Sequence, residues 1–120
     1  EIKVPIARSK YTFGRFAVNE EGKMAETSFK LLKKYYYQDK AYSLVEINLK
    51  TGRTHQIRVH FSYLGWPLVG DLAYGGKSLL GLSRPFLESL KIEFKHPITK
   101  INLCFEGELA GDLKELLLKL

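Results

Sequence analysis

Four basic or titratable side chains fall within eight positions near the middle of the chain. They are Arg53, His55, Arg58 and His60, in the segment Thr51-Gly52-Arg53-Thr54-His55-Gln56-Ile57-Arg58-Val59-His60. Guanidinium groups and protonated imidazoles bind carboxylates and phosphates through charge-assisted hydrogen bonds. Packing alone does not require such crowding, so the segment predicts an anion or RNA site.

A strand and a helix would hold these side chains in place. Val45, Ile47 and Leu49 alternate with the residues between them, which is the period of a strand with one face on a core. Gly52 permits a turn after this strand. A helix is then expected from about His55 to Leu64.

The expected helix has a start signal, a buried face and a stop signal. Thr54 is expected to cap it, because a threonine hydroxyl can accept a hydrogen bond from an unpaired amide of the first turn. Ile57, Phe61 and Leu64 recur at spacings of four and three and would form the buried stripe. Gly65 tolerates a left-handed turn and would end the helix.

Arg58 lies one position off that stripe, at the boundary between the core and a cleft. His55 lies three residues earlier on the same side, near the positive end of the helix. The two side chains would suit a carboxylate or phosphate. The alternative is an ordinary surface ion pair made by Arg58, since such pairs are common and often contribute little.

Other chemistries are disfavoured by residue spacing. His55 and His60 are five residues apart, whereas two metal ligands on one face of a helix are usually four apart. The sequence contains no Gly-x-Ser-x-Gly motif and no glycine-rich loop ending in Lys-Ser or Lys-Thr. We therefore expect no metal site, no serine hydrolase of that type and no phosphate-binding loop.

Composition gives broad limits. The chain has 120 residues, 45% of them hydrophobic, which suffices for one core. Its net charge of +6 favours phosphate-rich partners, although many proteins of this charge bind none. Cys104 is the only cysteine, so an internal disulfide is excluded. No apolar run approaches the roughly 20 residues of a membrane span, and we expect no membrane partner.

The central segment resembles the RluA-type pseudouridine synthases. Their hallmark is a strand, a Thr-Gly-Arg-Thr-His-Gln-Ile-Arg turn and helix, and then Gly-Asp before Tyr-Gly. The corresponding residues here are Thr51 to Arg58, Gly70-Asp71 and Tyr74-Gly75. The resemblance extends upstream to Ile2 and downstream to Phe105, so it covers nearly the whole chain.

This resemblance implies an enzyme that detaches uracil from its ribose, rotates it and rejoins it through a carbon. Such enzymes use a catalytic aspartate and neither a metal nor an organic cofactor. Arg58 matches the arginine that pairs with that aspartate. Arg53, Thr54, His55 and Gln56 would bind RNA or support the active site.

Family members carry the catalytic aspartate in a His-Arg-Leu-Asp segment, followed by a strand with an active-site tyrosine. Neither segment occurs in this sequence. We therefore expect residues 1–120 to be a single unit, the C-terminal portion of a synthase catalytic domain, and to be inactive alone. The expected partner is RNA, ribosomal rather than transfer RNA, in the bacterial cytoplasm or an organelle. Two alternatives stay open: a non-catalytic basic RNA-binding module, and a structural domain with incidental charge.

The expected fold class is α+β, with a predominantly antiparallel, partly mixed sheet, the motif helix and a C-terminal helix. Strands over 24–37 and 41–49 would pair around a turn at 38–40, and a second hairpin would pair 90–94 with 101–105. A short helix would start at Gly111-Asp112 and present Leu113, Leu116, Leu117 and Leu120 on one face. Trp66 is expected to anchor packing and Tyr74 to order the loop that follows it.

Overall fold

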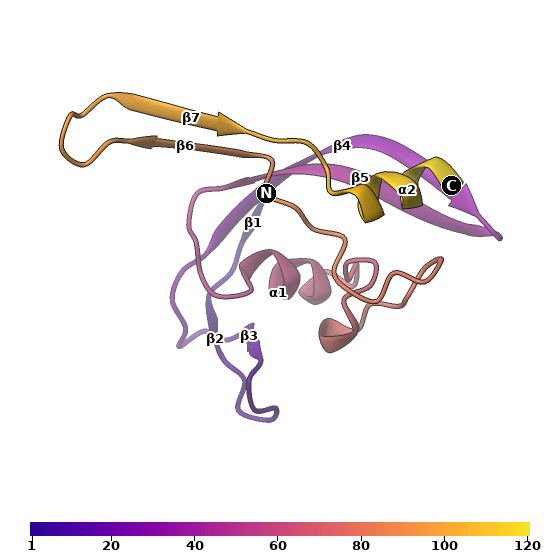
Figure 1. The fold of residues 1–120 in the computed structure, drawn as a ribbon. Coiled ribbons are helices and arrows are strands. Elements are labelled where there is room, and N and C mark those ends of the chain that lie inside the picture. The colour runs from indigo at the N-terminus through magenta and orange to yellow at the C-terminus, as the bar shows by residue number, and fades with distance from the viewer.

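The structure, a computed structural model, describes all residues from Glu1 to Leu120 and has three antiparallel sheets and two α-helices (Figure 1). In chain order the elements are β1 (Ile2–Lys3), β2 (Ile6–Arg8), β3 (Phe16–Val18), β4 (Glu26–Tyr37), β5 (Lys40–Leu49), α1 (Gln56–Tyr63), the 3-10 helix η1 (Leu72–Tyr74), β6 (Lys91–Lys95), β7 (Asn102–Glu106) and α2 (Gly111–Lys119). The predicted α+β class is confirmed. Every strand pair is antiparallel, so the partly mixed character is not found among these residues.

The longest element is the hairpin of β4 and β5, which pairs as the alternation of apolar residues predicted. Its turn consists of Gln38 and Asp39, both with positive φ, a two-residue turn whose twist matches that of the strands. The register shifts between Leu31 and Lys33, which marks a bulge in β4. β1 pairs with the other edge of β4 near its start.

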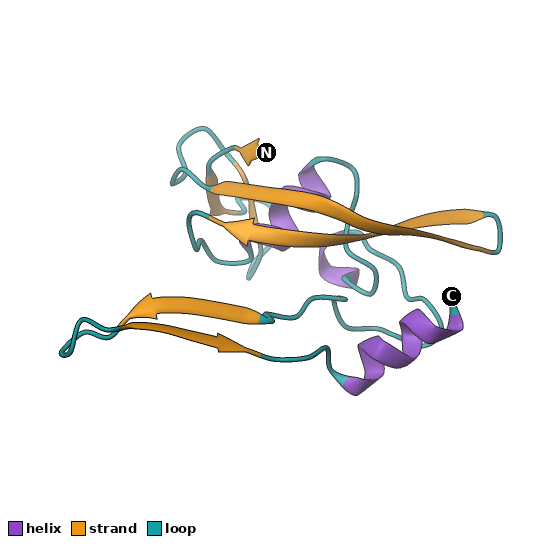
Figure 2. Ribbon diagram, turned by 90° about the horizontal axis from the view of Figure 1, so that it is seen from above, coloured by secondary structure: helices purple, strands orange, loops and turns teal.

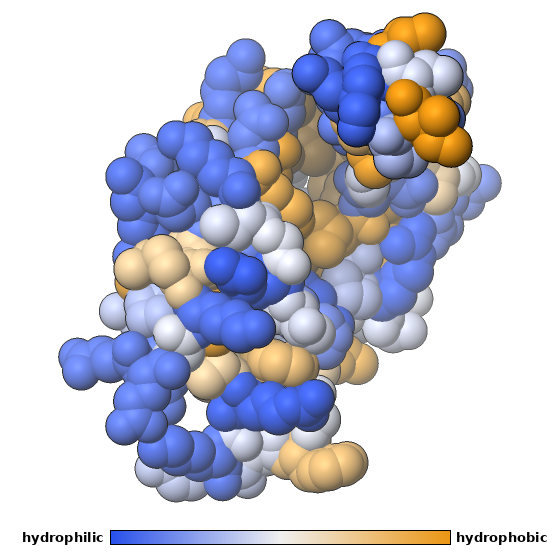
Figure 3. All heavy atoms as spheres, turned by 90° about the vertical axis from the view of Figure 1, so that its left-hand side faces the viewer, coloured by the Kyte–Doolittle hydropathy of each residue, from blue (hydrophilic) through white to orange (hydrophobic).

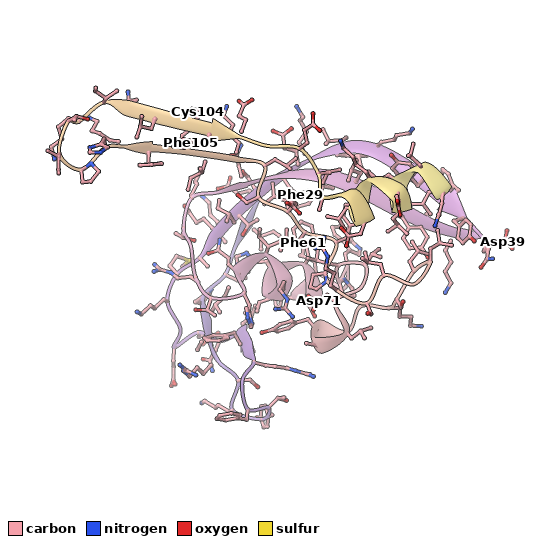
Figure 4. The ribbon with its side chains drawn as sticks, in the orientation of Figure 1. Phe29, Asp39, Phe61, Asp71, Cys104 and Phe105 are labelled. Carbon is pink, nitrogen blue, oxygen red and sulfur yellow. The ribbon has the colours of Figure 1, made fainter.

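Helix α1 packs against the start of this hairpin and against the small β2–β3 sheet (Figure 1). The rings of Phe29 and Phe61 lie 5.1 Å apart, and Figure 4 shows them facing each other between β4 and α1. Val59 joins Ile6 and Ala25 in the main apolar core. These contacts fix the position of α1 beneath the sheet.

The predicted buried stripe of α1 is partly wrong. Phe61 is buried, but Ile57 is only half-buried and Leu64 is exposed. The buried face instead includes polar side chains, Gln56 and His60, because the start of β4 offers hydrogen-bond partners as well as apolar contact.

The C-terminal third is arranged differently. In Figures 1 and 2, the β6–β7 hairpin projects away from the rest of the molecule, and Figure 3 shows apolar groups in the hollow beneath it. Every residue of β6 is exposed. Helix α2 buries Leu113 and Leu116 against Leu82 in a second small core, as its leucine spacing predicted. No helix has both the length and the apolar character needed to cross a bilayer.

Candidate functional site

The turn between β5 and α1 is shaped by Gln56, the first residue of the helix. Gln56 Oε1 accepts hydrogen bonds from the backbone N–H of Arg53 (2.9 Å) and the hydroxyl of Thr51 (2.8 Å). The residue before the helix is His55, with left-handed φ and ψ of 55° and 23°, and no side chain caps the helix. The prediction that Thr54 caps α1 is therefore wrong, because the Gln56 amide already holds the turn.

The backbone conformation of His55 sets the directions of two side chains. A non-glycine residue in the left-handed region carries a conformational cost of roughly 1–2 kcal/mol. Such costs persist where surrounding contacts determine the conformation, and they cluster at active sites and ligand clamps. Here the conformation sends the His55 side chain toward Tyr74, while Gln56 turns into the core.

A chain of buried hydrogen bonds runs from Gln56 to the N-terminal strands. Gln56 Nε2 donates to the Glu26 carbonyl and to the Thr27 hydroxyl, both at 2.9 Å. Thr27 Oγ1 lies 2.8 Å from His60 Nδ1, and His60 Nε2 lies 3.0 Å from the Val4 carbonyl. A carbonyl only accepts, so Nε2 carries the His60 proton and Nδ1 accepts from Thr27. Burial lowers the pKa of His60, and this neutral side chain joins α1 to β4 and to the Val4 carbonyl.

The C-terminal end of α1 confirms the predicted stop at Gly65. Its φ is 84°, its N–H bonds to the Ser62 carbonyl, and the N–H of Trp66 bonds back to the Phe61 carbonyl. This is a Schellman motif. The prediction that Trp66 anchors packing is wrong, since 62% of it is exposed. The left-handed turn takes the chain off the packed face of the helix.

Arg58 forms a two-pronged ion pair with Asp71. Arg58 Nε donates to Asp71 Oδ2 at 3.0 Å, and Nη2 donates to Oδ1 at 2.8 Å. The side chain of Asp71 is 1% exposed and that of Arg58 is 22% exposed. The hydrogen bond to Asp71 raises the pKa of Arg58, which keeps the guanidinium charged. Its other amino group, Nη1, makes no hydrogen bond within the chain.

Close backbone packing puts Asp71 in reach of α1. Figure 4 shows Asp71 beside this helix, in the loop that carries η1. A Cβ at Gly70 would overlap the carbonyl of Arg84, and one at Gly76 would overlap the carbonyl of Leu68. The N–H of Gly76 also bonds to the Asp71 carbonyl at 2.8 Å. The glycines of this stretch therefore allow the tight loop that positions the carboxylate.

Tyr74 connects Arg58, His55 and the β2–β3 sheet. The Arg58 guanidinium carbon lies 4.8 Å from the centre of the Tyr74 ring, within the range of a cation–π contact. The Tyr74 hydroxyl accepts from the backbone N–H of Phe16 (3.0 Å) and lies 2.7 Å from His55 Nδ1. Ser62 Oγ donates to the Tyr74 carbonyl at 2.7 Å. These contacts order the loop at Tyr74, as predicted.

The same contacts bear on the protonation of His55. The Tyr74 hydroxyl has one proton and two lone pairs, so besides accepting from Phe16 N–H it can either donate to His55 Nδ1 or accept from it. Burial, and then the charge of Arg58, lower the pKa of His55. Both effects favour the neutral imidazole, and its Nδ1 is held by Tyr74.

The structure brings some of the predicted site residues together and separates others. Arg58 and His55 meet at Tyr74, whereas Gln56 faces the core. Arg53 and Thr54 are exposed at the turn, where Arg53 Nε braces the chain by donating to the Met24 carbonyl at 2.9 Å. Sequence reasoning missed the role of Asp71 as the partner of Arg58. The signal for it was present in the Gly-Asp that precedes Tyr-Gly.

The arrangement suits the binding of a further anionic group. A charged guanidinium is held by Asp71 and stacked on Tyr74, with one amino group still free, and the His55 imidazole lies against the same tyrosine. Fixed donors of this kind bind a carboxylate or phosphate at little further cost in side-chain ordering.

Known proteins share this chain's sequence and fold. Residues 1–63 match the family described as RNA pseudouridylate synthase. The chain is 40% identical over 116 residues to a Bacillus subtilis protein named as the uncharacterized RNA pseudouridine synthase YlyB. This alignment covers 97% of the chain and 37% of that protein. The chain is 37% identical over 124 residues to ribosomal large subunit pseudouridine synthase C of Pasteurella multocida, with the same two shares covered.

A solved structure gives the same result. The chain superimposes on human RNA Pseudouridylate Synthase Domain Containing 1 with a TM-score of 0.68 and 31% identity, over 93% of this chain and 49% of that one. The chain thus spans about 37% of the length of the curated relatives it matches. On its sequence and its fold, it belongs to the RNA pseudouridylate synthase family.

Proposed function

We propose that this chain is the C-terminal portion of the catalytic domain of an RNA pseudouridine synthase that modifies ribosomal RNA in the bacterial cytoplasm or an organelle. Several relatives are named as ribosomal large subunit pseudouridine synthases, which supports ribosomal over transfer RNA. The relatives are longer than the chain, which leaves room for a segment that carries the catalytic aspartate.

The proposed reaction is an isomerisation. The bond between uracil N1 and ribose C1′ breaks, and a bond between uracil C5 and C1′ forms. C5 loses a proton and N1 gains one, so the product has the composition of the substrate. The uridine must leave its base stack to reach the reacting groups. No electron donor or acceptor is needed for this balance.

The observation that carries the proposal is the state of Arg58. Enclosure of a catalytic carboxylate with a flipped-out base would favour its protonation, because burial disfavours the charged form. A fixed guanidinium favours the ionised carboxylate and orients it. Asp71 occupies Nε and Nη2 of Arg58, which leaves Nη1 for the catalytic aspartate.

The remaining predicted residues have supporting roles in this proposal. His55, held at Nδ1 by Tyr74, would support the site beside Arg58. Arg53 and Thr54, both exposed, lie where an RNA backbone would contact the turn. Gln56 acts indirectly, since its buried amide holds the turn that positions the other three.

The test uses the full-length protein that contains this chain, with large-subunit ribosomal RNA labelled with tritium at uracil C5. Wild-type protein should release tritium, because C5 loses its proton. Arg58→Ala should abolish most single-turnover release at saturating RNA while RNA affinity falls modestly. Arg58→Lys keeps a charge but loses the planar fork, and should recover only part of the rate. Near-normal turnover by Arg58→Ala, with lost affinity, would make Arg58 a phosphate contact.

One observation favours the second candidate, a binding module without chemistry. The charge of Arg58 is already matched by Asp71 within the chain, so the pair needs no further carboxylate to be stable. Such a module would bind ribosomal RNA with a salt-dependent affinity and release no tritium. The wild-type measurement alone therefore separates the two candidates.

A further inference from the structure

The loop that joins β2 to β3, residues 9–15, presents two aromatic side chains entirely to solvent. Tyr11 is 97% exposed and Phe13 is 103% exposed, relative to the same residue type in an extended peptide. Figure 1 shows this loop extending from the molecule on the side opposite the sheet of β4 and β5. Phe13 packs against nothing in the chain, so the fold of these residues does not explain an aromatic side chain there.

The β2–β3 loop is nevertheless well ordered by its own hydrogen bonds. The Ser9 hydroxyl accepts from the backbone N–H groups of Tyr11 (3.2 Å) and Thr12 (3.1 Å), and the N–H of Ser9 donates to the Arg15 carbonyl (2.8 Å). Gly14 supplies the positive φ, 79°, that closes the loop. A loop already held in shape loses little freedom when a ligand binds.

Basic residues lie in and beside the loop. They are Arg8, Lys10 and Arg15, of which Lys10 has its Nζ 3.9 Å from a Glu21 carboxylate oxygen, and the sequence has no acidic residue between Glu1 and Glu20. The Arg8 guanidinium carbon lies 5.5 Å from the centre of the Phe16 ring. Alternating cations and exposed aromatic rings are typical of surfaces that bind single-stranded nucleic acid, where rings stack on bases and cations contact phosphates.

The base of the β2–β3 loop touches the candidate site. Phe16 pairs with Arg8 in the sheet and donates its N–H to the Tyr74 hydroxyl. Its ring meets the His55 ring edge to face, with 5.6 Å between centres. Phe16, the residue directly after the loop, therefore contacts Tyr74 and His55 of the candidate site.

We propose that the β2–β3 loop binds unpaired RNA bases next to the target uridine, with Tyr11 and Phe13 stacking on them and the neighbouring cations contacting phosphates. This inference rests on the proposed function. A uridine that leaves its stack also deprives its neighbours of a stacking partner, and an exposed aromatic ring beside the site can replace it.

The experiment compares two RNAs in the full-length protein: a uridine-rich single strand of about 12 nucleotides, within the size range that single-strand sites cover, and a duplex of the same length. Replacing both Tyr11 and Phe13 by Ala should weaken single-strand binding by at least about fivefold, the lower end of the stacking contribution of one base. Duplex binding and the salt dependence should stay unchanged. Phe13→Trp should retain the affinity.

Two control variants separate stacking from other effects. Tyr36→Ala removes a ring that is 72% exposed but lies near the far end of the β4–β5 hairpin, and should leave both affinities unchanged. Lys10→Ala should instead lower the salt slope for the single strand, by about 0.7 for each phosphate that the side chain neutralises in the wild type.

Two results would overturn the loop assignment. One is unchanged single-strand affinity in the double variant. The other combines two measurements: the double variant melts at a lower temperature than wild type, and the tryptophan fluorescence of Tyr11→Trp without RNA has its maximum at short wavelength. Together these would show that the rings pack against another part of the protein. Tritium release by wild type is measured separately: its absence, with loop-dependent binding intact, would overturn only the proposed function.

Discussion

Two Arg–Asp pairs of nearly the same geometry occur in different regions of the molecule. Arg58 and Asp71 join α1 to the η1 loop, while Arg84 and Asp112 join the segment before β6 to α2. In each pair Nε and Nη2 donate to the two carboxylate oxygens, at 3.0 and 2.8 Å in the first and 2.8 Å twice in the second. Distances alone do not distinguish them.

Their surroundings differ strongly. The carboxylate of Asp71 is 1% exposed, whereas that of Asp112 is 50% exposed. Water screens the exposed pair and can solvate either partner alone, but it cannot solvate Asp71. Identical hydrogen bonds should therefore have very different consequences when one partner is removed.

The largest effect is expected from breaking the buried pair. Arg58→Ala should lower the free energy of unfolding by about 3–5 kcal/mol, because Asp71 is left as an uncompensated buried charge. Urea unfolding of the 120-residue chain measures this. Arg84→Ala is the matched control and should shift the midpoint only slightly. Equal losses in the two variants would show that burial does not decide the energy of these pairs.

A smaller loss is expected at Gln56. Gln56→Leu keeps a side chain of similar size but removes four hydrogen bonds, and it leaves the Arg53 N–H and the Thr51 hydroxyl proton without an acceptor. Each buried polar group left unsatisfied costs roughly 1–3 kcal/mol. Thr54→Ala, next to the same turn, is the control and should have almost no effect, since the Thr54 hydroxyl caps nothing. A larger loss at Thr54 than at Gln56 would reverse our account of the turn.

The His60 network should make stability depend on pH. The unfolded histidine titrates near 6.5, while burial lowers the folded pKa of His60, so the unfolded chain binds more protons in the interval between the two values. The free energy of unfolding should therefore fall as pH falls below about 6.5, and level off below the folded pKa. His55, also with a lowered pKa, acts in the same direction.

Urea midpoints at pH of about 7.5 and 5.5 measure this effect in a range where ordinary carboxylates, which titrate near pH 4, remain ionised. His60→Gln can keep a donor and an acceptor but does not titrate, so its midpoint should vary less with pH. A wild-type midpoint that rises as the pH falls would mean that folded His60 takes up a proton more readily than the unfolded side chain.

The same contrast between regions explains what could be predicted from sequence. Local signals worked in both: alternation placed β4, β5, β6 and β7, and Gly65 ended α1. Long-range polar contacts could not be predicted. Gln56 was expected to bind RNA or support the active site, and the burial of its amide could not be foreseen, because its partners on β4 come from residues about 30 positions earlier. No local pattern carries that information.

Alternation also cannot tell a covered strand from an uncovered one. Ile92 and Phe94 alternate as Val45 and Ile47 do, yet the first pair is exposed and the second is half-buried. The rings of Phe94 and Phe105 stack across the β6–β7 hairpin with 5.9 Å between their centres. The β6–β7 hairpin therefore has an apolar face that no other part of this chain covers.

The smallest effect on stability is therefore expected at the β6–β7 hairpin. In the 120-residue chain, Phe94→Ser should change the free energy of unfolding by no more than about 0.5 kcal/mol, as for other surface substitutions. It should also reduce the fluorescence of a bound hydrophobic dye, because it removes exposed apolar area.

The matched control lies in the same third of the chain. Leu113 is fully buried in the core beneath α2, so Leu113→Ala should cost about 2–5 kcal/mol, because its apolar packing is removed and a cavity remains. If Phe94→Ser cost as much as Leu113→Ala and left dye binding unchanged, the hairpin would be packed in solution, through self-association or by folding back. If both substitutions behave as expected, the residues before β6 and the α2 core carry the stability of the chain, and the hairpin remains an apolar surface open to a covering partner.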